Sequence, residues 1–194
     1  MNHDIALKTA EALVEHLRPA CVRIEIAGSI RREKAEVKDI ELVCIPDLTI
    51  VPRRAPLEFG KPIPLLYKTE LDRLIAEMTN VVIEKNGDRM KKLDLRYAGI
   101  NVDLFIVLPP ATWGVLMTIR TGPFDFSRWC VTRRRKGGAL PNGYRVQDGA
   151  VWKGEHAIPD AEVETRVGFA KELEFLEFLG LGWIEPRDRE AKWK

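Results

Sequence analysis

The sequence of 194 residues contains only three cysteines, Cys21, Cys44 and Cys130, which are far apart and show no CxxC spacing. A disulfide framework or a zinc cluster needs paired or closely spaced thiols, so the sequence favours neither. A chain of this length buries enough surface to fold without such cross-links. Unpaired thiols suit a reducing compartment, and we therefore expect a cytoplasmic protein.

Long hydrophobic runs are also missing. No stretch reaches 18 apolar residues, and the first residues, MNHDIALKTAEAL, contain no apolar core, so we expect neither a membrane span nor a signal peptide. An excess of one charge is missing too, because 31 Lys and Arg residues face 29 Asp and Glu residues. A surface for nucleic acid would therefore have to come from local clustering of basic residues.

Apolar residues alternate with polar ones in some segments and recur every three or four residues in others, which predicts strands mixed with helices. We expect helices at 4–18, 69–78, 111–120, 123–136 and 169–179. We expect strands at 22–26, 37–45, 81–85, 90–97, 100–108 and 144–152. The stretch 46–64 contains five prolines and is predicted to be a loop. This pattern indicates an α+β fold with a mixed sheet.

Two of the predicted strands carry acidic residues on one face. Asp39 and Glu41 are two residues apart in one strand, so their side chains project from the same face. In the other strand, Asn101 and Asp103 share a face for the same reason. If the two strands are neighbours, three carboxylates converge at one rim of the sheet. Such charges cannot all ionise cheaply without a counter-ion. A pair of Mg²⁺ ions would provide it and would serve phosphoryl transfer.

A second candidate feature precedes these acids. Gly28 and Ser29 follow a predicted strand, open a short helix and are followed by Arg32. A Gly-Ser turn offers backbone N–H groups and a hydroxyl to an anion, and an arginine can add a bidentate phosphate contact. Each feature alone is more typical of a polar turn or a solvated strand face. Their order along the chain is what indicates chemistry.

In this order the sequence resembles the nucleotidyltransferase superfamily built on the polymerase beta fold, and more specifically the family X DNA polymerases. The resemblance is carried by IEIAGSIRREKAEVKDIELV (24–43), INVDLFIV (100–107), the Thr121-Gly122 turn, GGALPNGYRV (137–146) and LEFLGLGWIEPRDR (176–189). The first motif defines the superfamily, whereas the later ones are more particular to family X. Together they extend over most of the chain.

The resemblance implies a polymerase-beta-like palm at 1–120, with a mixed sheet flanked by helices, and a small nucleotide-binding and DNA-binding subdomain at 121–194. It implies that Asp39, Glu41 and Asp103 are the metal-binding catalytic carboxylates. Asp103 would also help to deprotonate the primer 3′-hydroxyl. The implied cofactors are two Mg²⁺ ions, with Mn²⁺ as a substitute.

The resemblance also implies residues for the incoming deoxynucleoside triphosphate (dNTP). Gly28, Ser29 and Arg32 would hold the triphosphate, while Thr121 and Gly122 would lie beside the sugar and base.

The sequence departs from the family pattern in three places. Glu41 stands where family polymerases usually have Asp, and Ile119-Arg120 stands where many members have aromatic residues near the sugar. Only about 20 residues precede the catalytic core, which leaves no room for a lyase domain or helix-hairpin-helix clamps. The chain resembles the minimal polymerases of this family that are known from viruses.

Without such clamps, DNA binding would rest on basic residues of the catalytic chain. The densest group in the sequence is Arg128, Arg133, Arg134, Arg135 and Lys136. Cations at the C-terminus of a helix interact favourably with its dipole, by ~0.3–1 kcal/mol. The number of cations in this group is larger than that effect explains. We expect this group to contact the DNA backbone, and the alternative is a solvated helix terminus.

We therefore expect a Mg²⁺-dependent DNA-directed DNA polymerase that adds dNMP to a primer 3′ end, in short gap filling and DNA repair. Its partner would be a primer-template or gapped duplex, it would act as a monomer, and it would work at a nucleoid or in a viral host cell. Two alternatives stay open. One is a nucleotidyltransferase for another acceptor, such as an RNA end, a protein, a small molecule or a template-independent DNA end. The other is a non-catalytic nucleic-acid-binding remnant.

Overall fold

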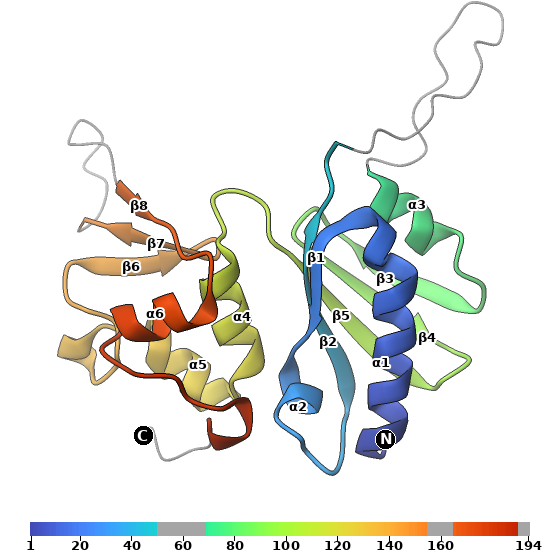
Figure 1. Ribbon diagram of the computed structural model, residues 1–194, viewed down its shortest axis with the longest axis horizontal. Helices are drawn as coiled ribbons and strands as arrows, with labels where there is room; N and C mark the ends of the chain where they lie inside the picture. Colours follow the sequence, from blue (N-terminus) through green and yellow to red (C-terminus); the bar gives the residue numbers. More distant parts are fainter. Residues whose placement is uncertain (50–68, 155–164, 190–194) are drawn as a thin grey trace, which may run out of the picture.

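A five-stranded mixed sheet organises the first half of the chain (Figure 1). The computed structural model describes residues 1–49, 69–154 and 165–189. The strands are β1 (Cys21–Ile26), β2 (Asp39–Pro46), β3 (Val81–Asn86), β4 (Met90–Leu95) and β5 (Ile100–Ile106), in the spatial order β1-β2-β5-β4-β3. Only β2 and β5 are parallel to each other; the remaining neighbours pair antiparallel. The predicted mixed sheet is confirmed.

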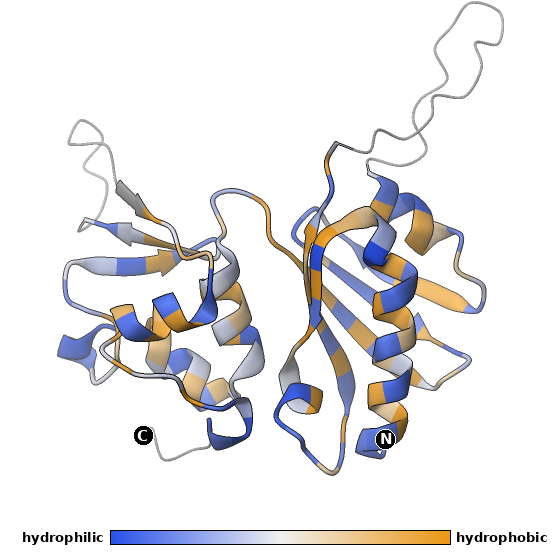
Figure 2. Cartoon of the chain, viewed as in Figure 1, coloured by the Kyte–Doolittle hydropathy of each residue, from blue (hydrophilic) through white to orange (hydrophobic). Residues whose placement is uncertain are grey.

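Helices α1 (His3–Leu17) and α3 (Glu70–Ala76) cover one face of this sheet. The Asn2 side chain caps α1 by accepting from the Asp4 N–H, and Pro19 lies in the short turn η1 (Arg18–Ala20) that follows. Apolar residues spaced by three and four along α1 are buried against alternate residues of β2, among them Ile40 and Leu42. Figure 2 shows the corresponding alternation of hydropathy along α1 and the strands.

Helix α4 (Trp113–Thr121) packs against the opposite face of the sheet and joins the two halves of the molecule (Figure 1). Its Trp113 and Met117 are buried against Val43 and Phe105 of the sheet, whereas its Val115 is buried in the second half. The boundary after residue 120 stays a prediction, and α4 contributes to the cores on both sides of it.

The second half combines a small antiparallel sheet with helices around its own core. Its elements are α5 (Phe124–Val131), η2 (Arg134–Lys136), β6 (Tyr144–Gln147), β7 (Ala150–Lys153), β8 (Thr165–Val167), α6 (Glu172–Phe178) and η3 (Pro186–Asp188). Phe126 and Cys130, spaced by four on α5, are fully buried there with Phe175 of α6. Strand β8 was not among the predicted elements.

The helix expected at 123–136 is wrong in its second half, because α5 ends at Val131. Thr132 is extended, and its carbonyl accepts from the Leu140 N–H at 3.0 Å. A Cβ placed on Gly138 would lie 1.9 Å from the Thr132 carbonyl oxygen, so the chain returns very close to the helix end. This return replaces the hydrogen bonds that a continuing helix would need.

The proline-rich segment expected to be a loop lies mostly outside the described residues. The three cysteines are free thiols, as expected. None of the helices in the described part of the chain is long and apolar enough to cross a membrane.

Candidate active site

The three carboxylates predicted from the sequence lie on two adjacent parallel strands. Strands β2 and β5 pair in a register that sets Asp39 opposite Asn101 and Glu41 opposite Asp103. Alternate residues of a strand share a face, so all three carboxyl groups project from the same side of the sheet. The structure therefore brings these acids together, while their metal-binding and catalytic roles stay predictions.

The acids border an apolar patch that faces α4. Val43 and Phe105 continue the same face of β2 and β5 and are buried against this helix. Because the patch removes water from one side of the acids, it makes their ionised forms more costly.

Glu41 shows this cost most clearly. Burial, together with the negative charge of Asp39, raises the pKa of Glu41 to about 7, although the positive charges of Arg32 and Arg120 act in the opposite direction. A cation bound among the acids would favour the ionised form of this carboxyl group.

The pKa of Asp103 is raised for similar reasons. Burial and the charge of Asp39 raise the pKa of Asp103, whereas Lys92 and Arg120 lower it. Its Oδ1 atom is buried and has no hydrogen-bond partner. A buried polar atom of this kind is costly in a folded protein, so it points to a ligand of the site.

The donor chemistry of this face fits a hard divalent cation such as Mg²⁺. Its three acids offer oxygen ligands, and one carboxylate oxygen is buried without a partner. Within residues 1–49, 69–154 and 165–189, no three His, Cys, Asp or Glu side chains are placed so that they could hold a metal ion as they stand. Asp39, Glu41 and Asp103 stay the predicted ligands of such a cation.

Sequence reasoning missed one cation of this face. Lys92 on β4 lies opposite Asp103, and its Nζ is 3.4 Å from the Glu84 carboxylate. The alternation in Met90–Leu95 indicates a strand but not its neighbour, so the sequence alone could not place Lys92 beside the acids.

The Gly28-Ser29 segment lies directly against Glu41. The Ala27 N–H donates to the Glu41 carbonyl at 2.8 Å, and helix α2 (Gly28–Arg31) starts at the next residue. Gly28 has a φ of +60°, and a Cβ there would lie 2.0 Å from Glu41 Oε2. Glycine is therefore required at this position for two reasons, the backbone conformation and the close approach. The Ser29 hydroxyl oxygen is buried and, like Asp103 Oδ1, has no hydrogen-bond partner.

The Thr121-Gly122 turn lies beside this segment. Arg32 donates to the Thr121 carbonyl, and Arg31 donates to Thr121 Oγ1 at 2.8 Å. A Cβ on Gly122 would lie 2.4 Å from the Phe126 ring, so the turn is packed tightly onto α5. Residues that the sequence separates by about 90 positions thus meet at one place.

A buried ion-pair network holds the two halves together next to this turn. Arg31 of α2 pairs with Glu172 of α6 at 2.9 Å, and Glu172 also pairs with Arg189 near the C-terminal end of the described chain. Glu172 and Arg189 are 6% and 0% exposed, so neither charge is solvated. Sequence reasoning did not single out this network, since its members lie on three distant segments.

The basic residues expected to contact DNA do not form one uniform surface. Arg133 donates to the Tyr144 carbonyl, and Arg134 donates to the carbonyls of Ala139 and Leu179. Both side chains therefore have structural partners within the second half. Arg128 lies in the last turn of α5, and Arg135 and Lys136 are exposed in η2. Contact of these five residues with DNA stays a prediction.

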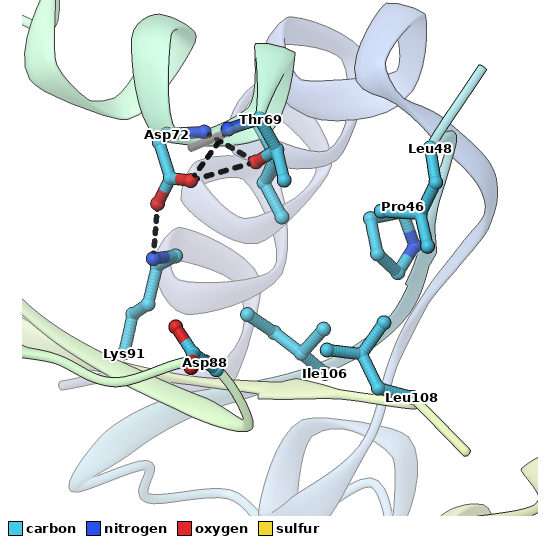
Figure 3. Close-up of a pocket in the computed structure, with 9 residues that line it drawn as sticks. Pro46, Leu48, Thr69, Asp72, Asp88, Lys91, Ile106 and Leu108 are labelled. Carbon is cyan, nitrogen blue, oxygen red and sulfur yellow. Dashed lines mark hydrogen bonds and ion pairs between the residues drawn. The ribbon is translucent and has the colours of Figure 1, made fainter. Parts of the chain in front are cut away.

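A cavity of about 240 Å³ lies on the other face of the sheet and is separate from the acids (Figure 3). Its Leu71 and Ile106 belong to the core beneath α1 and α3. Lys91 there donates to Asp72, which also caps α3 through Thr69. These polar groups already have partners, so the cavity adds nothing to the acid face.

The sequence matches no protein-family model and no curated protein. The structure is similar to the crystal structure of Leishmania infantum polymerase beta in a ternary P/T complex, with a TM-score of 0.64 and 16% sequence identity. The match covers 98% of this chain and 77% of that chain. At this identity it shows the fold, a polymerase-beta-like mixed sheet flanked by helices.

Proposed function

We propose that this chain is a nucleotidyltransferase that adds a deoxynucleotide to the 3′ end of a DNA primer, as in the filling of short gaps. The observation that carries the proposal is the pairing of β2 with β5, which gathers Asp39, Glu41 and Asp103 on one face, with Glu41 against Gly28. The polymerase-beta-like fold supports it.

In this proposal the acceptor 3′-oxygen attacks the α-phosphorus of a dNTP, and the bond to the leaving pyrophosphate breaks. Asp103 Oδ1, which is buried without a hydrogen-bond partner, takes the proton of the attacking hydroxyl. Two Mg²⁺ ions bound by Asp39, Glu41 and Asp103 would stabilise the negative charge on the attacking and leaving oxygens.

The triphosphate would lie along the Gly28-Ser29 segment. The Ser29 hydroxyl has no hydrogen-bond partner in the fold, so it can donate to a phosphate oxygen. Arg32 is held beside it through the Thr121 carbonyl and would contribute charge. Thr121 and Gly122 would border the sugar and the base, and the second half of the chain would bind the nucleotide and the DNA backbone.

A second candidate is a nucleotidyltransferase for a different acceptor. Glu41 favours it, because its carboxylate stands one methylene further from the strand than that of the usual aspartate and so shifts any bound cation. An RNA end, a protein or a small molecule would then take the place of the primer.

The proposal is tested by offering labelled dNTPs and Mg²⁺ to the protein with a gapped duplex, single-stranded DNA and RNA as acceptors. We expect extension of the gapped duplex, with the templated nucleotide preferred. Exclusive labelling of RNA or of the protein itself would establish the second candidate.

The control for that experiment is the pair of variants Asp39→Asn and Asp103→Asn, which keep the shape of the side chains and remove their charge. Both should lose transfer by about 10²–10³-fold, a size typical of electrostatic catalysis, and should melt no lower than the wild type. Full activity in both variants would overturn the assignment of the site.

A further inference from the structure

Arg120 lies in the last turn of α4, where this helix meets the acid face. Its guanidinium carbon is 3.8 Å from the centre of the Phe105 ring. Phe105 follows Asp103 by two residues on β5 and therefore projects from the same face of the sheet. Stacking on this ring thus places the positive charge of Arg120 next to the carboxylates.

Arg120 lies beside the acids without pairing with them. In the described part of the chain it has no ion pair within 4.0 Å, and its Nε is buried without a hydrogen-bond partner. Its positive charge opposes the burial that raises the pKa of Glu41 and of Asp103. The guanidinium is held by the aromatic ring, so the carboxylate oxygens stay available to another cation.

A fixed positive charge near a carboxylate cluster has two opposite effects. It stabilises the ionised acids in the absence of metal, and it repels any divalent cation that approaches them. The repulsion weakens once a polyanion such as a triphosphate enters and offsets the arginine charge. Burial lowers the pKa of Arg120, but an arginine stays protonated at all ordinary pH values, so the charge is permanent.

Resting on the proposed function, we propose that Arg120 is a resident counter-ion of the carboxylate face, which weakens the binding of free divalent cations and makes their tight binding depend on the nucleotide. Arg120 is then a positioning residue for the cation site, one that acts on the acids through charge.

The test is the affinity of the free protein for Mn²⁺ alone, measured by electron paramagnetic resonance or calorimetry. In Arg120→Met, which keeps an apolar contact with Phe105 and removes the charge, we expect Mn²⁺ to bind about tenfold more tightly. Arg120→Gln gives the same comparison if Arg120→Met does not fold. Arg120→Lys keeps the charge without the planar stack and should bind Mn²⁺ within about threefold of the wild type.

The matched control is Arg23→Met. The Arg23 guanidinium stacks on Trp113 at 3.9 Å, a cation–π contact of the same kind, but its charge is paired with Glu25. Its Mn²⁺ affinity should therefore stay unchanged. A second readout is the melting temperature without metal at pH 8, which should fall in Arg120→Met and recover with Mn²⁺ more than in the wild type.

Equal Mn²⁺ affinity in Arg120→Met, Arg120→Gln and the wild type would overturn the inference, whatever the transfer activity. Failure of the proposed function alone would give a different result. If the variants bind Mn²⁺ more tightly but no acceptor is ever extended, Arg120 is a counter-ion of a cation site and the proposed function fails alone.

Discussion

Close packing between Gly28 and Glu41 determines which side chains the site tolerates. The backbone of Gly28 is left-handed, and the position of a Cβ on it is already occupied by the Glu41 carboxylate. Gly99 has a similar φ of +65°, but nothing lies within 4 Å of its Cβ position. A substitution at either glycine would strain the backbone, but only a substitution at Gly28 would also cause a steric clash.

Gly28→Ala should therefore lower both stability and transfer, whereas Gly99→Ala should lower stability alone. The shared backbone strain is worth ~1–2 kcal/mol, and displacement of Glu41 adds to it only in Gly28→Ala. Chemical denaturation and nucleotide transfer measure the two effects. If Gly28→Ala lost no more stability and no more activity than Gly99→Ala, the close packing of Gly28 on Glu41 would be contradicted.

Glu41 gives the metal-free protein a defined pH dependence. The pKa of Glu41 is raised from 4.5 to about 7 in the folded chain, so the folded chain binds a proton that the unfolded chain releases. This contribution to stability is complete below about pH 4.5 and is lost as pH rises through 7. At pH 8 the ionised carboxylate should cost about 3 kcal/mol, the equivalent of this rise in pKa.

Glu41→Gln should remove this dependence and raise stability at pH 8 without metal, as measured by denaturation between pH 5 and pH 8. The control is Glu11→Gln on the exposed side of α1, which should leave the profile unchanged. If the stability of the wild type did not change between pH 5 and pH 8, ionisation of Glu41 would not destabilise the folded chain.

At the scale of the elements, the contact between α2 and α6 depends on one carboxylate. Glu172 pairs with Arg31 of the first half and with the fully buried Arg189. Removing it would leave Arg189 buried without a counter-charge, which costs ~3–5 kcal/mol.

Glu172→Ala should therefore lower the free energy of unfolding by this amount, whereas Glu177→Ala, on the exposed side of the same helix, should change it by less than ~0.5 kcal/mol. Thermal and urea denaturation of the full chain provide the measurement. A Glu172→Ala variant as stable as the wild type would show that this ion pair does not stabilise the contact between α2 and α6.

The turn that follows α5 divides the basic residues by role. Arg134 donates to the carbonyl of Leu179 at the end of α6, so Arg134→Ala should reduce stability by about 1–2 kcal/mol. The exposed Arg135 and Lys136 should matter for DNA instead. Replacing both by alanine should weaken binding to all duplex sequences and reduce the slope of log affinity against log salt by about 1–2.

Melting temperature separates these outcomes, since the Arg135→Ala and Lys136→Ala changes should lower it by less than Arg134→Ala does. An unchanged salt slope in the double variant would place the DNA on another surface of the protein.

Over the whole molecule, local patterns were sufficient to predict most elements. The spacing in α1 and the alternation in β2 and β5 predicted both their type and the face that carries the acids, because burial on one side imposes these periods. The end of α5 could not be predicted, since it depends on Gly138 returning against Thr132. Strand β8 has only three residues, too few for any period to show.

The parts of the site that could not be predicted are those made by register and long-range contact. Lys92 faces Asp103 only because β4 neighbours β5, and Arg120 reaches the acids only because α4 packs across that sheet. Charge composition carries no information about either placement. The candidate carboxylates and Arg32 were recognisable because a chemical motif marked them, whereas Lys92 belongs to no motif.

The proposal that Asp39, Glu41 and Asp103 form one cation site facing the Gly28-Ser29 segment can be tested directly by crystallography. The crystal would contain Mn²⁺ and a non-hydrolysable dNTP analogue, and anomalous scattering would locate the metal. We expect Mn²⁺ bound to oxygens of all three carboxylates, with the triphosphate against Ser29. Manganese bound elsewhere, or a nucleotide remote from these carboxylates, would contradict it.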